Sequence, residues 1–412
     1  MNNDTKKEIK KFMITQCLFG LAVFICCFQN TIRSYNSTML ALSYEYGFTS
    51  RALLGTIYHM LNNLPFLDMM SYQSAFILAL TVTIIFFLYL MYFSYFCVKN
   101  SPDEVRKPVE ALLLFLNTFI ISTFSGGYNF FRIDLFLITV ALLSAQIIAK
   151  NHFIYLTIPL SAIGVMFHQG FVFMYFNISL VLLLYISLCK EGSVRKKHLF
   201  IFITSFIICS ALFLWFEFFS RTNGHNVFDK VVQDARMVSL DGKYHTSLLE
   251  HEVLGINVRG AEAEWHKMVV IQLLYFTILM LPFLLIFAKF FIRIFKNASA
   301  KIDKIKYTLI LIGAGTMLPD FILQIDFGRW VLAVITYYIV VIIMVIILGD
   351  TIIKDELIKM YNQIKQKPYS MLFFIYPILF IPLYDVDINA LTKTLADLTN
   401  NVFNIFIIPR AG

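Results

Sequence analysis

The chain has 412 residues, of which 59% are hydrophobic and 15% charged, with a formal net charge of +8. A soluble domain carries about 25% charged residues, and apolar runs such as 330–348 have no polar face to present to water. The composition therefore excludes a soluble enzyme. It predicts an all-α, multi-pass membrane protein, because a helix closes its own backbone hydrogen bonds inside lipid.

The apolar runs predict a bundle of about eleven membrane-spanning helices with a cytoplasmic N-terminus. The whole chain, 1–412, is expected to form a single integral membrane domain. The first run has a basic lead but no small-residue cleavage site, so we expect an uncleaved helix. Several runs are shorter than the roughly 20 residues of a full crossing. In chain order the predicted spans are 12–28, 74–98, 109–124, 133–149, 153–167, 171–188, 199–219, 268–291, 308–323, 330–348 and 369–384.

Lysine and arginine fall on opposite sides of this predicted topology. On the inside lie 19 of the 23 lysines, whereas 8 of the 11 arginines lie outside. The lysines follow the positive-inside rule. Only arginine has a planar fork that suits carboxylates and phosphates. The asymmetry predicts an anionic ligand at the outer face, and the alternative is that each outer arginine is an interfacial anchor or an ion-pair partner.

Three of the outer arginines share one setting, the start of a predicted helix. Arg51 opens a run spaced as an amphipathic helix at the interface, with Thr49 or Ser50 as its expected N-cap. Arg132 and Arg329 directly precede the fourth and tenth predicted spans. A cation beside a helix N-terminus is disfavoured by about 0.3–1 kcal/mol. An anion bound jointly by the guanidinium and the free N–H groups would remove that penalty.

A nearby acid is the alternative source of negative charge at each of these arginines. In that case the group is structural, and no ligand is needed. The candidate acids also count as candidate substrate contacts. The pairs would be Glu45 with Arg51, Asp134 with Arg132, and Asp326 with Arg329.

Two further features of the outer face are candidates for chemistry. His168 lies at the outer end of the fifth predicted span, where a titratable ring could act as a general base or be a satisfied structural residue. The longest outer segment, 220–267, mixes both charge signs, which fits a folded cap over a polar substrate as well as a solvated loop. Within it, Arg236 and Arg259 are candidate substrate-binding residues. No Cys/His spacing suggests a metal site.

Four short runs carry a resemblance to a known family. They are the 44–55 stretch, FRID at 131–134, FHQG at 167–170 and DFGRW at 326–330. Together they resemble the EpsG-like branch of the Wzy-type polysaccharide polymerases, over roughly 44–330. The chain departs from the pattern of some Wzy polymerases, because no outer arginine is followed by glycine eleven residues later. This departure weakens any transfer of roles onto Arg236 or Arg259.

The resemblance implies a glycosyltransferase in the cytoplasmic membrane of a bacterium, working on the outer face without metal or cofactor. Such enzymes transfer a growing glycan from polyprenyl pyrophosphate onto the sugar of another lipid-linked repeat unit. Arg51, Arg132 and Arg329 would then bind the donor pyrophosphate, whose developing negative charge needs stabilisation. His168 would activate the acceptor hydroxyl or hold it in place. The lipid bilayer and a chain-length regulator are the implied partners, with no nucleic acid.

Other functions stay open. A glycosyltransferase that uses a polyprenyl-phosphate sugar would need an acidic pair in the first outer loop, where the sequence offers Glu45 and Asp68. A flippase or transporter would place charges along an intramembrane path, and the spans hold only Glu217 and Asp320 near their ends. A membrane acyltransferase would depend on His168.

Overall fold

The structure is a computed structural model, and the part of the chain that it describes consists of helices and the turns between them, without a strand. The chain divides into two compact units. Unit 1 comprises Met1–Gln29, Phe87–Gly127 and His266–Gly412, and unit 2 comprises Asn30–Phe86 and Tyr128–Trp265. The described residues are 3–28, 30–64, 69–125, 129–219, 225–254, 281–319 and 327–367.

Five of the described helices are long and apolar enough to cross a membrane, which identifies a multi-pass membrane protein. They are Asn3–Cys27, Tyr72–Asn100, Asp103–Ser125, Gly192–Phe218 and Gly328–Ile347. The all-α prediction is thereby confirmed, while the count of eleven spans and the orientation stay predictions. The predicted span 369–384 and the first part of 268–291 lie outside the described residues.

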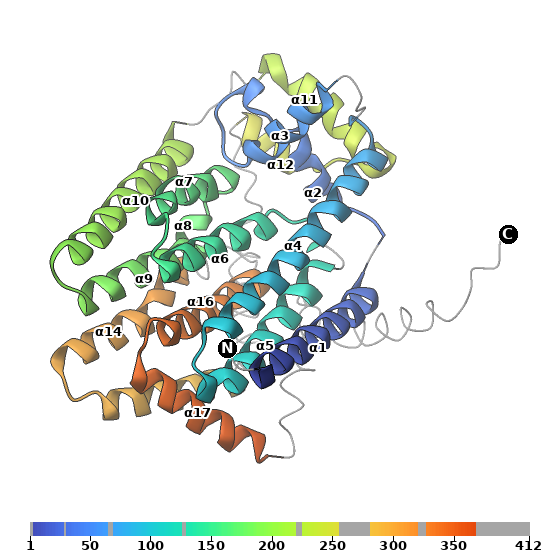
Figure 1. Cartoon of the computed structure of the whole chain (residues 1–412). Coiled ribbons are helices and arrows are strands. Elements are labelled where there is room, and N and C mark those ends of the chain that lie inside the picture. The colour runs from blue at the N-terminus through green and yellow to red at the C-terminus, as the bar shows by residue number, and fades with distance from the viewer. Residues whose placement is uncertain are drawn as a thin grey trace, which may run out of the picture. The chain divides into compact units, whose positions relative to one another are not determined.

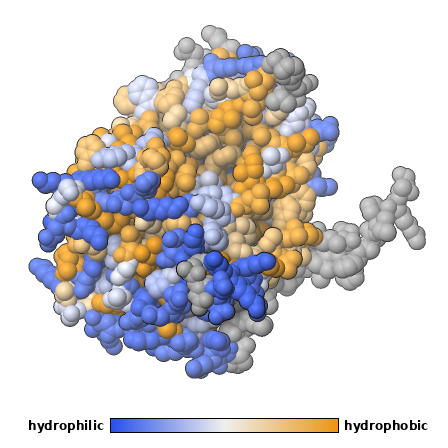
Figure 2. Space-filling model, viewed as in Figure 1, coloured by the Kyte–Doolittle hydropathy of each residue, from blue (hydrophilic) through white to orange (hydrophobic). Residues whose placement is uncertain are grey.

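Unit 1 is built on two largely buried helices, α5 (Arg106–Ser125) and α16 (Phe327–Ile347), which pack against each other. Helix α1 (Asn3–Cys27) packs on α5 and leaves an apolar stripe exposed, at the spacing of one helix face. Hydrophilic side chains gather around its charged start (Figure 2). Such a stripe is stable against lipid and unfavourable in water. Its exposed residues are Ile14, Leu18, Leu21 and Ile25.

A buried hydrogen-bonded cluster of Gln16, Ser94 and Asn117, here named the polar knot, joins α1, α4 (Tyr72–Asn100) and α5 in unit 1. The Ser94 hydroxyl accepts from Gln16 Nε2 at 3.0 Å and from Asn117 Nδ2 at 2.8 Å, and donates to the Leu90 carbonyl at 2.9 Å. All three side chains are at most 1% exposed. Helices in lipid gain little from hydrophobic burial against one another, so small residues and polar contacts of this kind supply much of their association.

Two tyrosines of α16 hold the end of α14 (Lys301–Ile312), where the α-helix gives way to η7 (Gly313–Met317). The Tyr337 hydroxyl donates to the Ile310 carbonyl and the Tyr338 hydroxyl to the Leu311 carbonyl, both at 2.8 Å. Carbonyls near a helix end lack intrahelical partners, and leaving them unpaired in a low-dielectric environment is costly. The tyrosines therefore allow the backbone to change geometry at this point.

One helix of unit 1, α17 (Thr351–Lys365), was not predicted, because its sequence falls in a charged inside segment. The local signals are nonetheless present. Gly349 takes a left-handed φ of 98°, and Asp350 caps the helix by accepting from the Ile353 N–H at 2.9 Å. The Tyr307 hydroxyl donates to the same carboxylate at 3.1 Å, which fastens the start of α17 to α14.

In unit 2 a group of apolar helices packs together: α6 (Asp134–Lys150), α7 (Thr157–Phe167), α9 (Phe176–Cys189) and α10 (Gly192–Phe218). The helices found at the predicted spans 153–167 and 171–188 are shorter than those spans: they are Ile154–Phe167 and Phe176–Cys189. The second is interrupted at Tyr175, which separates α8 (Phe171–Met174) from α9. At 1.5 Å per residue, α9 is about 21 Å long, against a hydrocarbon core of about 30 Å.

Unit 2 also contains segments that the sequence predicts on the outer face of the membrane. The chain from 34 to 62 forms α2 (Ser34–Thr38), η1 (Met39–Ala41), η2 (Tyr44–Tyr46) and α3 (Ala52–Asn62). Onto it packs the described part of the 220–267 segment, here named the cap: α11 (His225–Val238), η6 (Leu240–Gly242) and α12 (Thr246–Leu254). Figure 1 shows these helices gathered together. Their shared core contains Ala41, Leu42, Tyr46, Ala52, Val231, Ala235, Leu249 and Val253.

The polar knot of unit 1 yields a prediction. Ser94→Ala would leave two buried amides without their common acceptor, and we expect the free energy of unfolding in detergent to fall by about 1–2 kcal/mol. Thr81→Ala is the matched control, because that exposed hydroxyl only donates back to the Ile77 carbonyl on the same helix. Equal thermal unfolding midpoints for the two variants would show that the knot contributes nothing.

Candidate functional site

Arg51 sits on a strained backbone at the start of α3. It is the N-cap residue, with φ 65° and ψ −3°, a left-handed conformation that is uncommon outside glycine. Its side chain makes no cap bond, and neither Thr49 nor Ser50 occupies the N-cap position, so the predicted cap was wrong. The Arg51 Nη1 lies 3.0 Å from Glu252 Oε1 of α12, and the Glu252 side chain is 5% exposed.

This ion pair corrects one sequence expectation. The acid proposed for Arg51 was Glu45, but Glu45 has a half-exposed side chain whose Oε2 lies 3.9 Å from His59 Nδ1. The acid that Arg51 meets comes instead from the cap, about 200 residues further along the chain. No local spacing rule connects the two positions, because only the packing of α12 on the 34–62 segment brings them together.

Arg132 follows a second strained residue, Phe131 at φ 61°. Arg132 and Asp134 are 4% and 0% exposed, and Arg132 Nε lies 3.3 Å from Asp134 Oδ2. Arg132 Nη1 also donates to Asn129 Oδ1 at 3.0 Å. Asp134 is the first residue of α6, where the helix dipole favours a carboxylate. The predicted Arg132–Asp134 pairing is therefore present, and Asp134 supplies negative charge at this helix start.

The segments that carry Arg51, Arg132 and His168 meet in unit 2. Asn36 of α2 donates from Nδ2 to the Phe130 carbonyl at 2.8 Å, which ties α2 to the loop before α6. The Ser50 hydroxyl contacts the Gln169 side-chain oxygen, and this contact joins the residues next to Arg51 and His168. The structure thus draws three of the predicted site segments into one cluster with the cap.

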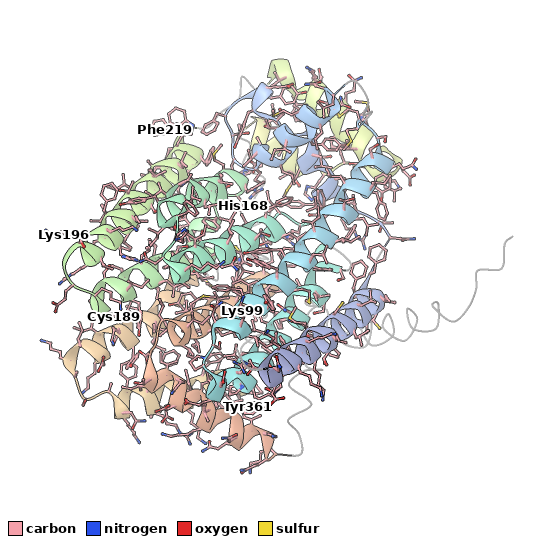
Figure 3. The ribbon with its side chains drawn as sticks, viewed as in Figure 1. Lys99, His168, Cys189, Lys196, Phe219 and Tyr361 are labelled. Carbon is pink, nitrogen blue, oxygen red and sulfur yellow. The ribbon has the colours of Figure 1, made fainter. Side chains whose placement is uncertain are left out.

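His168 is held by its own loop at the end of α7 (Figure 3). It is 7% exposed, and its Nδ1 accepts from the Gly170 N–H at 2.8 Å. A Cβ at position 170 would lie 2.9 Å from Nδ1, so this close approach requires glycine. Because Nδ1 accepts, the neutral ring carries its proton on Nε2. This tautomer suits a hydrogen-bond donor that positions a substrate hydroxyl better than a general base acting through Nε2.

Of the other predicted site residues, the structure describes Arg236 and Arg329. Arg236 is exposed in the last turn of α11, where a cation suits the helix dipole, and its Cζ lies 5.7 Å from the centroid of the Tyr244 ring. Arg329 is 6% exposed and lies in the first turn of α16, in unit 1. Asp326 and Arg259 lie outside the described residues.

Sequence reasoning missed several polar residues that complete the cluster. The Tyr46 hydroxyl donates to Asp234 Oδ2 at 2.6 Å, and burial together with this bond raises the pKa of Tyr46, so the phenol stays protonated. The Tyr35 ring contacts both Arg132, at 5.7 Å from Cζ to the ring centroid, and the His245 ring, at 5.3 Å between centroids. Tyr35 and Tyr46 could hardly be singled out as site residues from the sequence, because isolated aromatic residues are common in this chain.

His245 fastens α12 to α2. Its backbone N–H donates to Thr38 Oγ1 at 2.9 Å. Its ring Nδ1 accepts from the Leu248 N–H at 3.2 Å, which makes it the cap residue of α12. Burial lowers the pKa of His245, so the folded state holds the neutral ring that this acceptor role needs. Within the described residues no group of three or more His, Cys, Asp or Glu side chains could hold a metal ion.

Comparison with protein-family models, curated proteins and solved structures finds no match for this chain.

The His245 contacts predict acid sensitivity of the cap. Because the pKa of His245 is lower in the folded state than its ordinary value of 6.5, the neutral ring stabilises the fold fully above pH 6.5. This stability is lost as the pH falls below 6.5 through the folded-state pKa of His245. Acidification from about pH 7.5 to about pH 5.5 should therefore destabilise the packing of α12, because a protonated ring can no longer accept from the Leu248 N–H. His245→Asn keeps a capping acceptor and should abolish the change. Hydrogen exchange of α12 amides measures it, and an unchanged pH dependence in the variant would disprove this role.

Proposed function

We propose that this protein polymerises lipid-linked oligosaccharide repeat units into a surface polysaccharide, at the outer face of a bacterial cytoplasmic membrane. The donor would be a glycan on polyprenyl pyrophosphate, and the acceptor the sugar of another lipid-linked unit. The proposal joins the resemblance of the 44–330 region to the Wzy-type polymerases with the polar cluster of unit 2. The five apolar helices agree with a substrate that is anchored in the bilayer.

The observation that carries the proposal is the coincidence of backbone strain with two ion pairs, one buried at Arg132 and one partly buried at Arg51. Five described non-glycine residues have positive φ, and one is Arg51 while another directly precedes Arg132. Strain of this kind costs about 1–3 kcal/mol per residue and concentrates at functional sites. Burying an ion pair also costs desolvation energy that its attraction need not recover. Both features are more readily explained by a role in ligand binding than by stability.

The ion pairs suggest how a pyrophosphate would bind. Glu252 and Asp134 each lie within ion-pair distance of one of the two guanidinium groups. A guanidinium has five N–H donors, so it can bind a phosphate oxygen while it stays beside its carboxylate. Each buried carboxylate thus keeps an opposite charge when the phosphate binds. Arg329 is assigned to the donor by the resemblance alone.

His168 would orient the acceptor in this proposal. Its Nε2–H can donate to the acceptor sugar hydroxyl while Nδ1 stays bonded to Gly170. The hydroxyl oxygen attacks the anomeric carbon as the bond to pyrophosphate breaks, and the hydroxyl proton leaves to solvent or to the pyrophosphate. The arginines stabilise the negative charge that develops on the leaving group.

Arg132→Lys tests the anion site. Lysine keeps the positive charge opposite Asp134 but loses the bidentate fork, so we expect chain extension to slow by about 100-fold. The measurement is the glycan length profile of the native bacterium carrying the variant in place of the parent. Arg195→Lys, at an exposed position in the predicted cytoplasmic part of α10, is the control. Normal chain length in Arg132→Lys, at equal protein level in the membrane, would exclude the role.

Deletion of the gene separates the candidate functions. Surface glycan that stops at one repeat unit is expected for loss of a polymerase. Absence of any exported repeat unit would instead indicate a flippase or an earlier transferase, and the polymerase proposal would be abandoned.

A second substitution distinguishes positioning from general base catalysis at His168. His168→Asn keeps an acceptor for the Gly170 N–H and a donor for the substrate, so activity should fall by about 10-fold or less, and His168→Ala should lose about 100-fold or more. A general base would make His168→Asn as inactive as His168→Ala. The initial rate of chain extension in isolated membranes, measured with both variants, gives the answer.

A further inference from the structure

Unit 1 contains a groove that the proposed reaction does not use. It consists of two adjoining cavities, of about 250 and about 200 Å³, which share Ile286, Phe290, Met360 and Ile364 as walls. The larger lies among α5, the helical residues 281–297, α16 and α17. Its walls are almost entirely apolar, with Phe115 and Phe283 in ring contact at 5.2 Å between centroids. A site of this shape and size fits a hydrocarbon chain better than a bulky polar ligand.

Helix α17 closes one side of the groove, and its sequence explains why. Ile353, Leu357, Met360 and Ile364 recur every three or four residues and so lie on one face of the helix. The charged residues of α17 lie on other faces and anchor it within unit 1. Lys354 Nζ bonds Glu104 Oε2 at 2.7 Å, in addition to the Tyr307–Asp350 bond at its start. The apolar face is therefore held toward the groove.

Most of the charged residues that line the groove belong to the smaller cavity. Lys289, Arg293 and Lys367 line it, and Lys365 lines the larger one. Among the described lining residues Glu356 is the one acid, and it is already bonded by Lys359 Nζ at 2.6 Å and Asn297 Nδ2 at 2.8 Å. Lys289 is exposed and Arg293 half-buried, with Arg293 Nη1 donating to Gln363 at 3.1 Å. The rim therefore has an excess of positive charge beside an apolar interior.

We propose that this groove binds one anionic phospholipid, with an acyl chain among the apolar walls and its phosphate at Lys289 and Arg293. A soluble anion would gain nothing from the hydrocarbon surface, and a neutral lipid nothing from the basic rim. Basic pockets between membrane helices on the cytoplasmic side are suited to anionic headgroups. The predicted orientation places this lysine-rich end of unit 1 on that side. Figure 2 shows hydrophilic side chains over α17, whose Tyr361 lines the larger cavity (Figure 3).

The test is lipid binding by the purified full-length chain. Native mass spectrometry would compare phosphatidylglycerol with phosphatidylcholine of the same acyl chains, and we expect at least about fivefold preference for the anionic lipid. The double variant Lys289→Gln and Arg293→Gln should remove the preference. The matched control changes two exposed lysines of α14 that do not line the groove, Lys301→Gln and Lys304→Gln, and should keep it.

A second variant tests the hydrocarbon part separately. Ala111→Phe places a ring in the wall of the larger cavity and should lower binding of both lipids while leaving the basic rim intact. Inorganic phosphate at the same concentration should not displace the bound lipid. Displacement by phosphate, with no effect of Ala111→Phe, would replace the proposal with a free-anion site. Equal binding of the two lipids would also overturn the proposal. So would the absence of lipid binding, which is the result expected if protein fills the groove.

Discussion

Compensation of buried charge is the constraint that organises unit 2. Arg132 and Asp134 are almost fully buried, and the acid partner of Arg51 is 5% exposed. An isolated charge at such a depth would be very costly, so each must find an opposite charge. Arg132 finds its partner two residues away, on the first turn of α6. Arg51 finds its partner only if α12 packs on the 34–62 segment, so formation of this pair depends on the cap being folded.

The sequence predicted the class of fold and the regions that matter, because hydrophobic runs and helix starts are local properties. All-helical architecture, several membrane-crossing helices and the Arg132–Asp134 pair all follow from neighbouring residues. The errors concern distant contacts. Glu252 instead of Glu45 at Arg51, and Asp234 at Tyr46, depend on the packing of α11 and α12. Helix α17 was missed because its charged, amphipathic sequence lacks the long apolar run that marks a span.

The two arginine pairs bear on how the proposed anion site would select its ligand. The sequence left two explanations open at each arginine, a bound anion or a nearby acid, and the structure shows an acid beside both. An arginine beside a carboxylate attracts anions less strongly from a distance than an isolated one. Selectivity of the proposed site would then come from geometry, since a ligand must fit the N–H donors that the carboxylate does not use. In the proposed polymerase, an abundant membrane-bound substrate would offset the weaker long-range attraction.

The shortness of α9 has a consequence for its surroundings. A helix of about 21 Å cannot reach both edges of a hydrocarbon core of about 30 Å. No residue of α9 from Phe176 to Leu188 is exposed, so neighbouring helices surround it. A short helix inside protein does not have to match the thickness of a bilayer, because protein groups can satisfy its backbone at membrane depth. The interruption at Tyr175 is tolerated for the same reason, since that residue is also fully buried.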